Sequence, residues 1–274
     1  MPEPHPDTTV LVSPVYLAGE GSAEPALRPL LEAGFRQEDD ALGNARLTSP
    51  TQRHRVDYMP RGLTQVQWRI SEGPDRYTPP IWQAAFTDNT PPEVVAAFTT
   101  ALAQDESPWP GGRRPRADDV LRPLAEAGWR RRENEWEIDF TSPDHLATVS
   151  YDTTPGHPLD SGYEPWLISG ARNLGHGHDW YAAFTTHTPT RLVTAVATRL
   201  SSPEPVPRTT TETLHPEATV THSAVRSSTP TDASRALAAR SCTRATTGGS
   251  QPQPSPMPVH KANQAASARP RHRR

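Results

Sequence analysis

Cysteine is almost missing from this chain. Cys242 is the only cysteine among 274 residues, so no disulfide can form within the chain, which is typical of proteins from a reducing compartment. Long apolar runs are missing too, since no stretch approaches the roughly 18 residues that a membrane-spanning helix needs. The opening residues, MPEPHPDTT, lack the basic start and the apolar stretch of a signal peptide. We therefore expect a cytoplasmic protein without a membrane partner.

Aromatic residues are missing from the last part of the chain. None occurs after Phe184, and the residues from 203 onward are mainly Thr, Ser, Pro and Ala. A segment of this composition cannot bury enough apolar surface to order itself. We therefore predict a disordered tail over residues 203–274.

Charge divides the chain at the same place. The formal net charge is −3, but it is −9 through Ser201 and +6 beyond it. An acidic body argues against a nucleic-acid-binding face on the folded part. The tail ends in a basic cluster, Arg269, Arg271, Arg273 and Arg274, whose residues are candidates for contact with nucleic acid. The same cluster is equally typical of a solubilising end in a protein rich in arginine.

The body contains an internal repeat. Leu27–Phe35 returns as Leu121–Trp129, with seven of nine positions identical. Further blocks return in the same order at offsets of 93 to 98 residues, with the equivalent pairs Ser49/Ser142, Val56/Val149, Trp68/Trp166 and Trp82/Trp180. Chance similarity would not keep order and spacing over so many blocks. We therefore predict two tandem copies of one unit, over residues 13–105 and 116–202.

Each copy is predicted to hold a helix, a four-stranded antiparallel meander and a second helix, which makes the fold class α+β. The first helix has an apolar stripe and ends at Gly34, or at Gly128 in the second copy, where the chain needs a left-handed conformation. Pro29 and Pro123 are awkward inside these helices, so each helix starts late or is kinked there. Alternating apolar residues then indicate four half-buried strands. Whether the copies share one sheet stays open.

The second helix of each copy follows a Thr-Pro pair. In the first copy we predict that Thr90 caps the helix, that Pro91 opens it and that Glu93 completes a capping box. The predicted buried stripes are Val94, Val95, Phe98 and Leu102 in the first copy, and Leu192, Val193, Val196 and Leu200 in the second.

These motifs in combination resemble a known family. The set comprises Tyr16-Leu17-Ala18-Gly19 and, in both copies, the helix-ending glycine, the Thr-Ser-Pro turn, the Trp-x-Ile strand and the Trp strand that leads into Thr-Pro. It resembles the actinobacterial family known as domain of unknown function 317, and the resemblance covers about residues 13–202. Such proteins are typical of streptomycetes and often carry the domain twice. The resemblance implies no activity, cofactor or catalytic residue, and the second copy departs from it because nothing like Tyr16–Gly19 precedes Asp118.

One polar cluster is a weak candidate for a metal site. His176, His178 and Asp179 precede the Trp180 strand, and two His with one Asp are residue types that bind metals. The equivalent loop of the first copy contains no His, so solvent-exposed His in a Gly-rich turn is the favoured interpretation. The residues give no reason to expect a cofactor.

The aromatic residues are candidates for an interface. Trp166 lies at an alternating strand position, where core packing is the default, although a Trp pair could line a cleft between the copies. Tyr181 follows Trp180 on the next strand, and Trp109 lies between two prolines in the linker. We therefore take Trp109, Trp166 and Tyr181 as candidate interface residues.

Three functions stay open. The preferred hypothesis is a non-enzymatic interaction module that offers a duplicated surface to an unknown protein, because no nucleophile elbow, phosphate loop or dinucleotide motif occurs. The first alternative is a nucleic-acid-associated accessory protein that acts through its basic tail. The second is an enzyme with its site between the repeats, which needs polar residues converging in a pocket.

Overall fold

The computed structural model describes residues 9–62, 64–75, 77–104, 117–154, 163–171, 178–209 and 219–222. All of them belong to one unit, Met1–Val225. Most of the predicted tail lies outside these residues.

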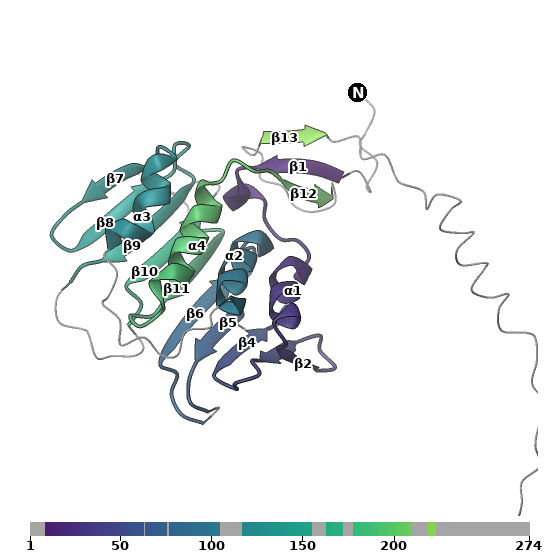
Figure 1. The fold of residues 1–274 in the computed structure, drawn as a ribbon. Coiled ribbons are helices and arrows are strands. Elements are labelled where there is room, and N and C mark those ends of the chain that lie inside the picture. The colour runs from purple at the N-terminus through teal and green to yellow at the C-terminus, as the bar shows by residue number, and fades with distance from the viewer. Residues whose placement is uncertain are drawn as a thin grey trace, which may run out of the picture. The chain divides into compact units, whose positions relative to one another are not determined.

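Ten antiparallel strands form one continuous sheet in the order β2-β3-β4-β5-β6-β11-β10-β9-β8-β7 (Figure 1). The first copy supplies α1 (Glu24–Glu32), β2 (Arg36–Asp39), β3 (Ala45–Thr48), β4 (His54–Tyr58), β5 (Val66–Glu72), β6 (Trp82–Thr87) and α2 (Pro92–Ala103). The second copy supplies α3 (Ala117–Glu126), β7 (Arg130–Glu133), β8 (Glu137–Thr141), β9 (Ala147–Asp152), β10 (Trp166–Gly170), β11 (Trp180–Phe184) and α4 (Thr190–Ser201). The predicted α+β fold with two like halves is confirmed.

Each half has one strand more than the four that we predicted. The additional strands, β2 and β7, read RQED and RRRE, so they lack the apolar alternation that marks a strand with one buried face. They form the two outer edges of the sheet. Charged edge strands are common because they discourage pairing with other chains.

The first helix of each half ends as predicted. Gly34 and Gly128 have φ of +83° and +79°, and the amide of the next residue donates to the carbonyl of Leu30 or Leu124. This is the Schellman arrangement, which the glycine permits at no steric cost. Both helices include their prolines, so the alternative of a late start is wrong.

The predicted capping box of α2 is wrong. The helix begins at Pro92, and no side chain bonds to its first amides. Thr90 Oγ1 is instead buried without a hydrogen-bond partner among the described residues. The Glu93 carboxylate is bound elsewhere, by Arg208. The predicted buried stripes of α2 and α4 are confirmed.

The two halves join through β6 and β11. Ala85 pairs with Ala183, its own equivalent in the other copy, so a pseudo-twofold axis passes between these two residues. The hydroxyl of Thr87 accepts the amide of Tyr181 at 2.8 Å, and Thr185 accepts the amide of Gln83 at the same distance. Equivalent bonds therefore close the junction on both sides of the axis, which answers the open question of one sheet or two.

All four helices cover one face of the sheet, in the spatial order α1-α2-α4-α3 (Figure 1). The centre of the core lies where α2 meets the junction strands. Phe98 of α2 stacks on Phe184 of β11 at 5.7 Å, and Phe86 of β6 meets both rings edge-on at 5.6 Å. These rings come from both copies, so neither half has a complete core of its own.

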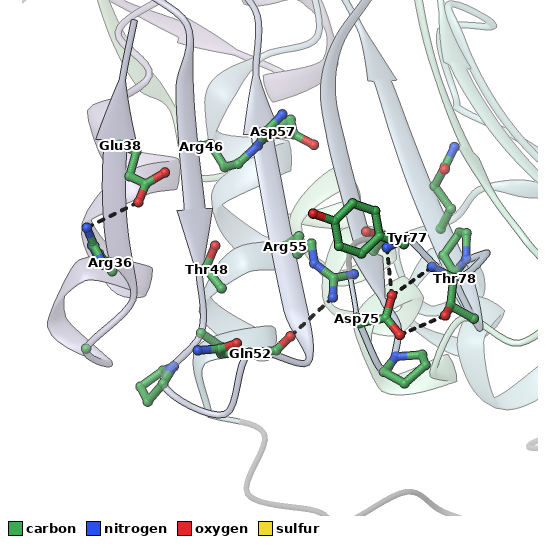
Figure 2. Close-up of a pocket in the computed structure, with 17 residues that line it drawn as sticks. Arg36, Glu38, Arg46, Thr48, Gln52, Arg55, Asp57, Asp75, Tyr77 and Thr78 are labelled. Carbon is green, nitrogen blue, oxygen red and sulfur yellow. Dashed lines mark hydrogen bonds and ion pairs between the residues drawn. The ribbon is translucent and has the colours of Figure 1, made fainter. Parts of the chain in front are cut away.

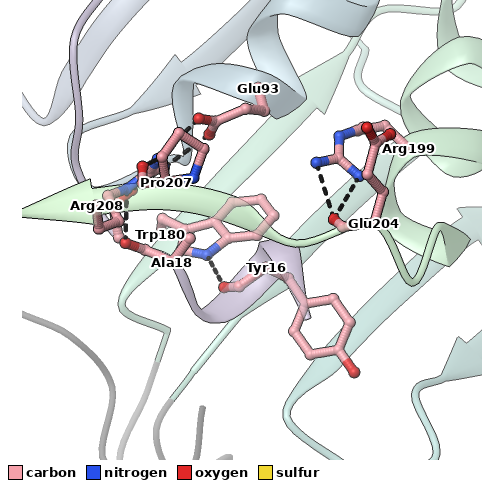
Figure 3. A network of polar contacts seen from close by, with 9 residues as sticks. Tyr16, Ala18, Glu93, Trp180, Arg199, Glu204, Pro207 and Arg208 are labelled. Atoms are coloured by element: carbon pink, nitrogen blue, oxygen red, sulfur yellow. Dashed lines mark hydrogen bonds and ion pairs between the residues drawn. The ribbon is translucent and has the colours of Figure 1, made fainter. Parts of the chain in front are cut away.

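A small second sheet joins the two ends of the body. Its order is β12-β1-β13, from β1 (Thr9–Ser13), β12 (Val206–Thr209) and β13 (Thr219–His222). The predicted tail began at residue 203, so the folded part extends beyond that boundary. Arg208 of β12 is buried and donates two hydrogen bonds of 2.7 Å to the Glu93 carboxylate and one to the carbonyl of Ala18 (Figure 3).

The segment that opens the first copy packs against the second copy. A short 3-10 helix, η1 (Val15–Leu17), follows β1. The Trp180 indole donates to the carbonyl of Tyr16 at 3.0 Å (Figure 3). The Tyr16 hydroxyl donates to Asp144. Burial and the nearby Asp144 carboxylate raise the pKa of Tyr16 well above its ordinary range. The segment around Tyr16, which belongs to the first copy, therefore packs against the second copy, which has no such segment of its own.

Candidate interaction surface

The face of the sheet opposite the helices carries most of the polar side chains of the strands. Because side chains alternate along a strand, Trp68 and Ile70 point to the helices while Arg69 and Ser71 point away. We call the surface formed by the side chains that point away from the helices the helix-free face. Antiparallel sheets often leave one face to solvent. The exposure of the helix-free face therefore says little about function, and the identity of its side chains is the informative feature.

Strand pairing lines these residues up in rows. The central row crosses all ten strands through the pseudo-twofold axis, and it reads Glu38, Arg46, Asp57, Arg69, Ala85, Ala183, Leu167, Ser150, Asp139 and Arg132. The axis relates the first five positions to the last five. Two of the related pairs have opposite charges: Glu38 matches Arg132, and Arg46 matches Asp139.

A second row lies two residues away from the central row along each strand. In the first half it contains Arg36, Thr48, Arg55, Ser71 and Gln83, and in the second half it contains Asp152 and Glu137. Over β3 to β5 the two rows hold three arginines and one acid. Over β8 to β10 they hold three acids and no base. The helix-free face is therefore basic on one side and acidic on the other.

The basic half contains an open depression of about 770 Å³ (Figure 2). Arg46 Nε lies 2.7 Å from Asp57 Oδ1, and Arg55 Nη2 reaches the carbonyl of Gln52 at 3.4 Å. At the end of the depression, Asp75 accepts the amides of Tyr77 and Thr78 and so holds the loop after β5 in place. The Tyr77 side chain on that loop is 87% exposed.

The acidic half gathers three carboxylates on β8 and β9. Burial raises the pKa of Glu137, and the neighbouring Asp139 and Asp152 raise it further. Asp139 accepts a hydrogen bond of 2.6 Å from Ser150, which is polar but uncharged. Among the hydrogen bonds and ion pairs of the described residues, none joins Asp139 or Glu137 to an arginine.

A buried glutamate lies on the other face, beneath the helices. Glu72 is 5% exposed, its Oε2 accepts the Trp82 indole at 2.6 Å, and Arg53 pairs with Oε1. His54 Nε2 lies 3.7 Å from Oε2. Burial alone would raise the pKa of Glu72, but its bonds with His54 and Trp82 and the charge of Arg53 outweigh burial and lower it to about 2. Its carboxylate is fully engaged, so Glu72 is a structural group.

The lowered pKa of Glu72 makes a testable difference in acid. Since the folded pKa is about 2 and the ordinary value is 4.5, the contribution of the carboxylate to stability is present above pH 4.5 and is lost as the pH falls towards 2. We expect Glu72→Gln to be less stable than the wild type by up to about 3 kcal/mol at pH 7, with the two converging near pH 2. Urea unfolding at a series of pH values measures this, and a difference independent of pH would contradict it.

The two predicted interface residues that the structure describes, Trp166 and Tyr181, lie on opposite faces of the sheet. Trp166 is buried and stacks on Tyr151 at 4.3 Å, so it belongs to the core. Tyr181 is half-buried on the helix-free face, beside the junction. Trp109, His176 and Arg269, Arg271, Arg273 and Arg274 lie outside the described residues.

His178 and Asp179 are both exposed at the start of β11, and no group of three metal-binding side chains occurs in the part of the chain that the structure describes. The charged rows were missed because they depend on strand register. The alternation of charged and apolar residues in each strand was the available signal.

The chain was compared with known proteins. The family model described as SPDY, domain of unknown function (DUF317), matches residues 48–109 and 141–206. The two matches span corresponding parts of the halves, from the last residue of β3 or β8 to a few residues past the second helix. Each half contains a segment that matches the DUF317 domain, which is consistent with two copies. No curated protein and no solved structure matches the chain. Within the described residues, no helix of this tandem DUF317 chain is long and apolar enough to cross a membrane.

Proposed function

We propose that this tandem DUF317 chain is a non-enzymatic interaction module of the cytoplasm, and that it binds another protein through the helix-free face of its sheet. The observation that carries the proposal is how the two halves differ. Most positions under the helices keep apolar residues, as in Val56/Val149 and Ile70/Ile168. The pairs Glu38/Arg132 and Arg46/Asp139 on the opposite face reverse their charge.

The arrangement of the charged groups favours a macromolecular partner. Arg46, Arg55 and Arg69 lie on three different strands, about 4.8 Å apart from strand to strand. Groups spread over rows suit a complementary protein surface, whereas a catalytic site needs them to converge on a few atoms. A second depression lies between α2 and α4, but half of its lining residues are alanines, and its one carboxylate, Glu93, is bound by Arg208.

The test compares two charge reversals on opposite faces. Arg55→Glu changes the basic depression, and Arg28→Glu is the matched control, because Arg28 lies exposed on α1 and makes one surface ion pair with Glu24. Proteins from the native cell extract are captured on immobilised wild type and on both variants, and the retained proteins are quantified. We expect Arg55→Glu to reduce the captured amount of the specific partner at least about tenfold. We expect Arg28→Glu to leave that amount unchanged. Equal capture by all three would refute the proposal.

Contact of the tail with nucleic acid is a separate proposal, supported by the charge of +6 beyond Ser201. Such contact would weaken steeply with salt, because it rests on phosphate neutralisation. It does not require the helix-free face, so the same capture experiment, with nucleic acid measured, separates the two proposals.

A further inference from the structure

We infer that the helix-free face binds a second copy of this chain, face to face, with the basic half of one copy over the acidic half of the other. The inference rests on the proposed function of this face and names its partner. It starts from the rows, because they fix which side chains would meet.

Two in-plane twofold axes through the Ala85–Ala183 pair keep the central rows of the two copies in line. If the axis runs along the strands and passes through the Ala85–Ala183 pair, each strand of one copy lies over its equivalent strand in the other: β3 over β8, β4 over β9 and β5 over β10. If the axis runs across the strands, each residue of the central row lies over the same residue of the second copy. The charges decide between these arrangements.

The axis along the strands places opposite charges together. In the central row Arg46 meets Asp139 of the second copy, and Glu38 meets Arg132 of the second copy. In the second row Arg55 meets Asp152 of the second copy. Because a twofold interface uses the same patch on both copies, each of these contacts occurs twice.

The axis across the strands places like charges together. Arg46 would then face Arg46, Asp139 would face Asp139, and Arg132 would face Arg132. Like charges facing each other across an interface are strongly unfavourable. The charge pattern therefore selects one arrangement and excludes the other.

The present partners of these groups leave room for the new contacts. Arg46 Nε binds Asp57 at 2.7 Å, but the Arg46 side chain is 55% exposed and a guanidinium has five N–H donors. On the other side, Asp139 bonds to the hydroxyl of Ser150 and lies beside Glu137. An arginine from a second copy would place a positive charge beside these two neighbouring carboxylates.

The size of the face suits a dimer. Ten strands with a spacing of about 4.8 Å and five residues of about 3.4 Å each give a patch of roughly 43 Å by 17 Å, or about 700 Å² per copy. Stable interfaces of standard size bury about 800 Å² per partner. Twisted sheets also pack face to face with their strands nearly aligned, as the selected axis requires.

A charge swap tests the inference, with mass measured by analytical ultracentrifugation on the full chain. The wild type is expected to be a dimer at micromolar concentration and to dissociate as salt is raised. Arg46→Asp alone or Asp139→Arg alone places two like-charge contacts in the dimer, so each should weaken dimerisation by more than about 100-fold. The double variant restores both contacts in reverse and should dimerise again.

Mixing the two single variants gives the sharpest result. In a mixed pair, the aspartate introduced by Arg46→Asp on one chain meets the arginine introduced by Asp139→Arg on the other. The unchanged Asp139 of the first chain meets the unchanged Arg46 of the second. The mixture should therefore form heterodimers although neither variant dimerises alone. Circular dichroism shows whether each variant is folded, and Arg28→Glu is the control that should dimerise like the wild type.

The outcomes also separate this inference from the proposed function. A monomeric wild type, or dimerisation that the swap does not change, overturns the inference. If capture of a different protein still depends on Arg55, the proposed function stands without it. If neither dimerisation nor capture responds to these variants, both are wrong.

Discussion

Replacing Arg208 with alanine is expected to lower the free energy of unfolding by about 3–5 kcal/mol, because the change leaves a partly buried carboxylate without its partner. Arg208 is 4% exposed and donates through Nη1 and Nη2 to Glu93, with 2.7 Å to each oxygen (Figure 3). Its Nε also satisfies the carbonyl of Ala18. The variant therefore loosens β12, the start of α2 and the segment after η1 together. Denaturant unfolding followed by circular dichroism measures the loss.

Arg199→Ala is the matched control. Arg199 lies on α4, close to β12. Among the described residues its side chain bonds to the carbonyl of Glu204, with two hydrogen bonds of 3.3 Å (Figure 3). We expect Arg199→Ala to lower the free energy of unfolding by about 1 kcal/mol or less. The double variant Arg208→Met with Glu93→Met should recover part of the loss, since replacing both partners of a buried pair by apolar residues is often neutral. Equal effects of Arg208→Ala and Arg199→Ala would contradict the assigned role.

The Arg208 pair also shows where sequence reasoning ends. Val206–Thr209 reads VPRT, follows a run of prolines and carries no apolar periodicity, so it resembles the tail behind it. Its order comes from pairing with β1, almost 200 residues earlier in the chain. A contact of that sequence separation leaves no local signal. The alternating Val10 and Val12 of β1, both buried, were the one local indication of a strand at the start.

Local chemistry, by contrast, was predictable. The glycine that ends each first helix is kept as predicted. The apolar stripe is kept only in part, since Leu30 and Leu124 are buried whereas Leu31 is 44% exposed. The cap of α2 failed for a tertiary reason, since Glu93 was drawn into the pair with Arg208. The charged strands β2 and β7 failed because an edge strand needs no apolar face.

The candidate surface lies between these two cases. Apart from those on β2 and β7, its residues stand in predicted strands. The charge pattern of the surface appears only when all ten strands are placed in register. The opposition of Arg46 and Asp139 can be read from the repeat alignment alone, since they are equivalent positions. That they lie in one row with the axis between them follows from the junction of β6 with β11. Alignment of the repeats therefore gives the charge reversal, and the fold gives its geometry.

Gly170 accounts for one difference between the two cores. It stands where the first half has Glu72, beside the equivalent tryptophan. In the first half the Trp82 indole donates to Glu72, whereas in the second half the Trp180 indole donates to the carbonyl of Tyr16. The absence of a side chain at Gly170 makes the room for Trp180, and Trp180 in turn holds η1 against the second half.

Gly170→Ala is therefore expected to cost on the order of 3 kcal/mol or more, from overpacking and a lost buried hydrogen bond together. An added Cβ would lie 2.5 Å from Trp180 Nε1 and 2.8 Å from Cε2, so the indole must move away from Tyr16. Gly62→Ala is the matched control, because a Cβ there would meet its nearest neighbours at an ordinary 3.5 Å. We expect Gly62→Ala to change the free energy of unfolding by no more than about 0.5 kcal/mol. Denaturant unfolding measures both variants, and hydrogen exchange at Val15–Leu17 locates the damage: if Gly170→Ala loses stability without faster exchange there, Trp180 does not hold this segment in place.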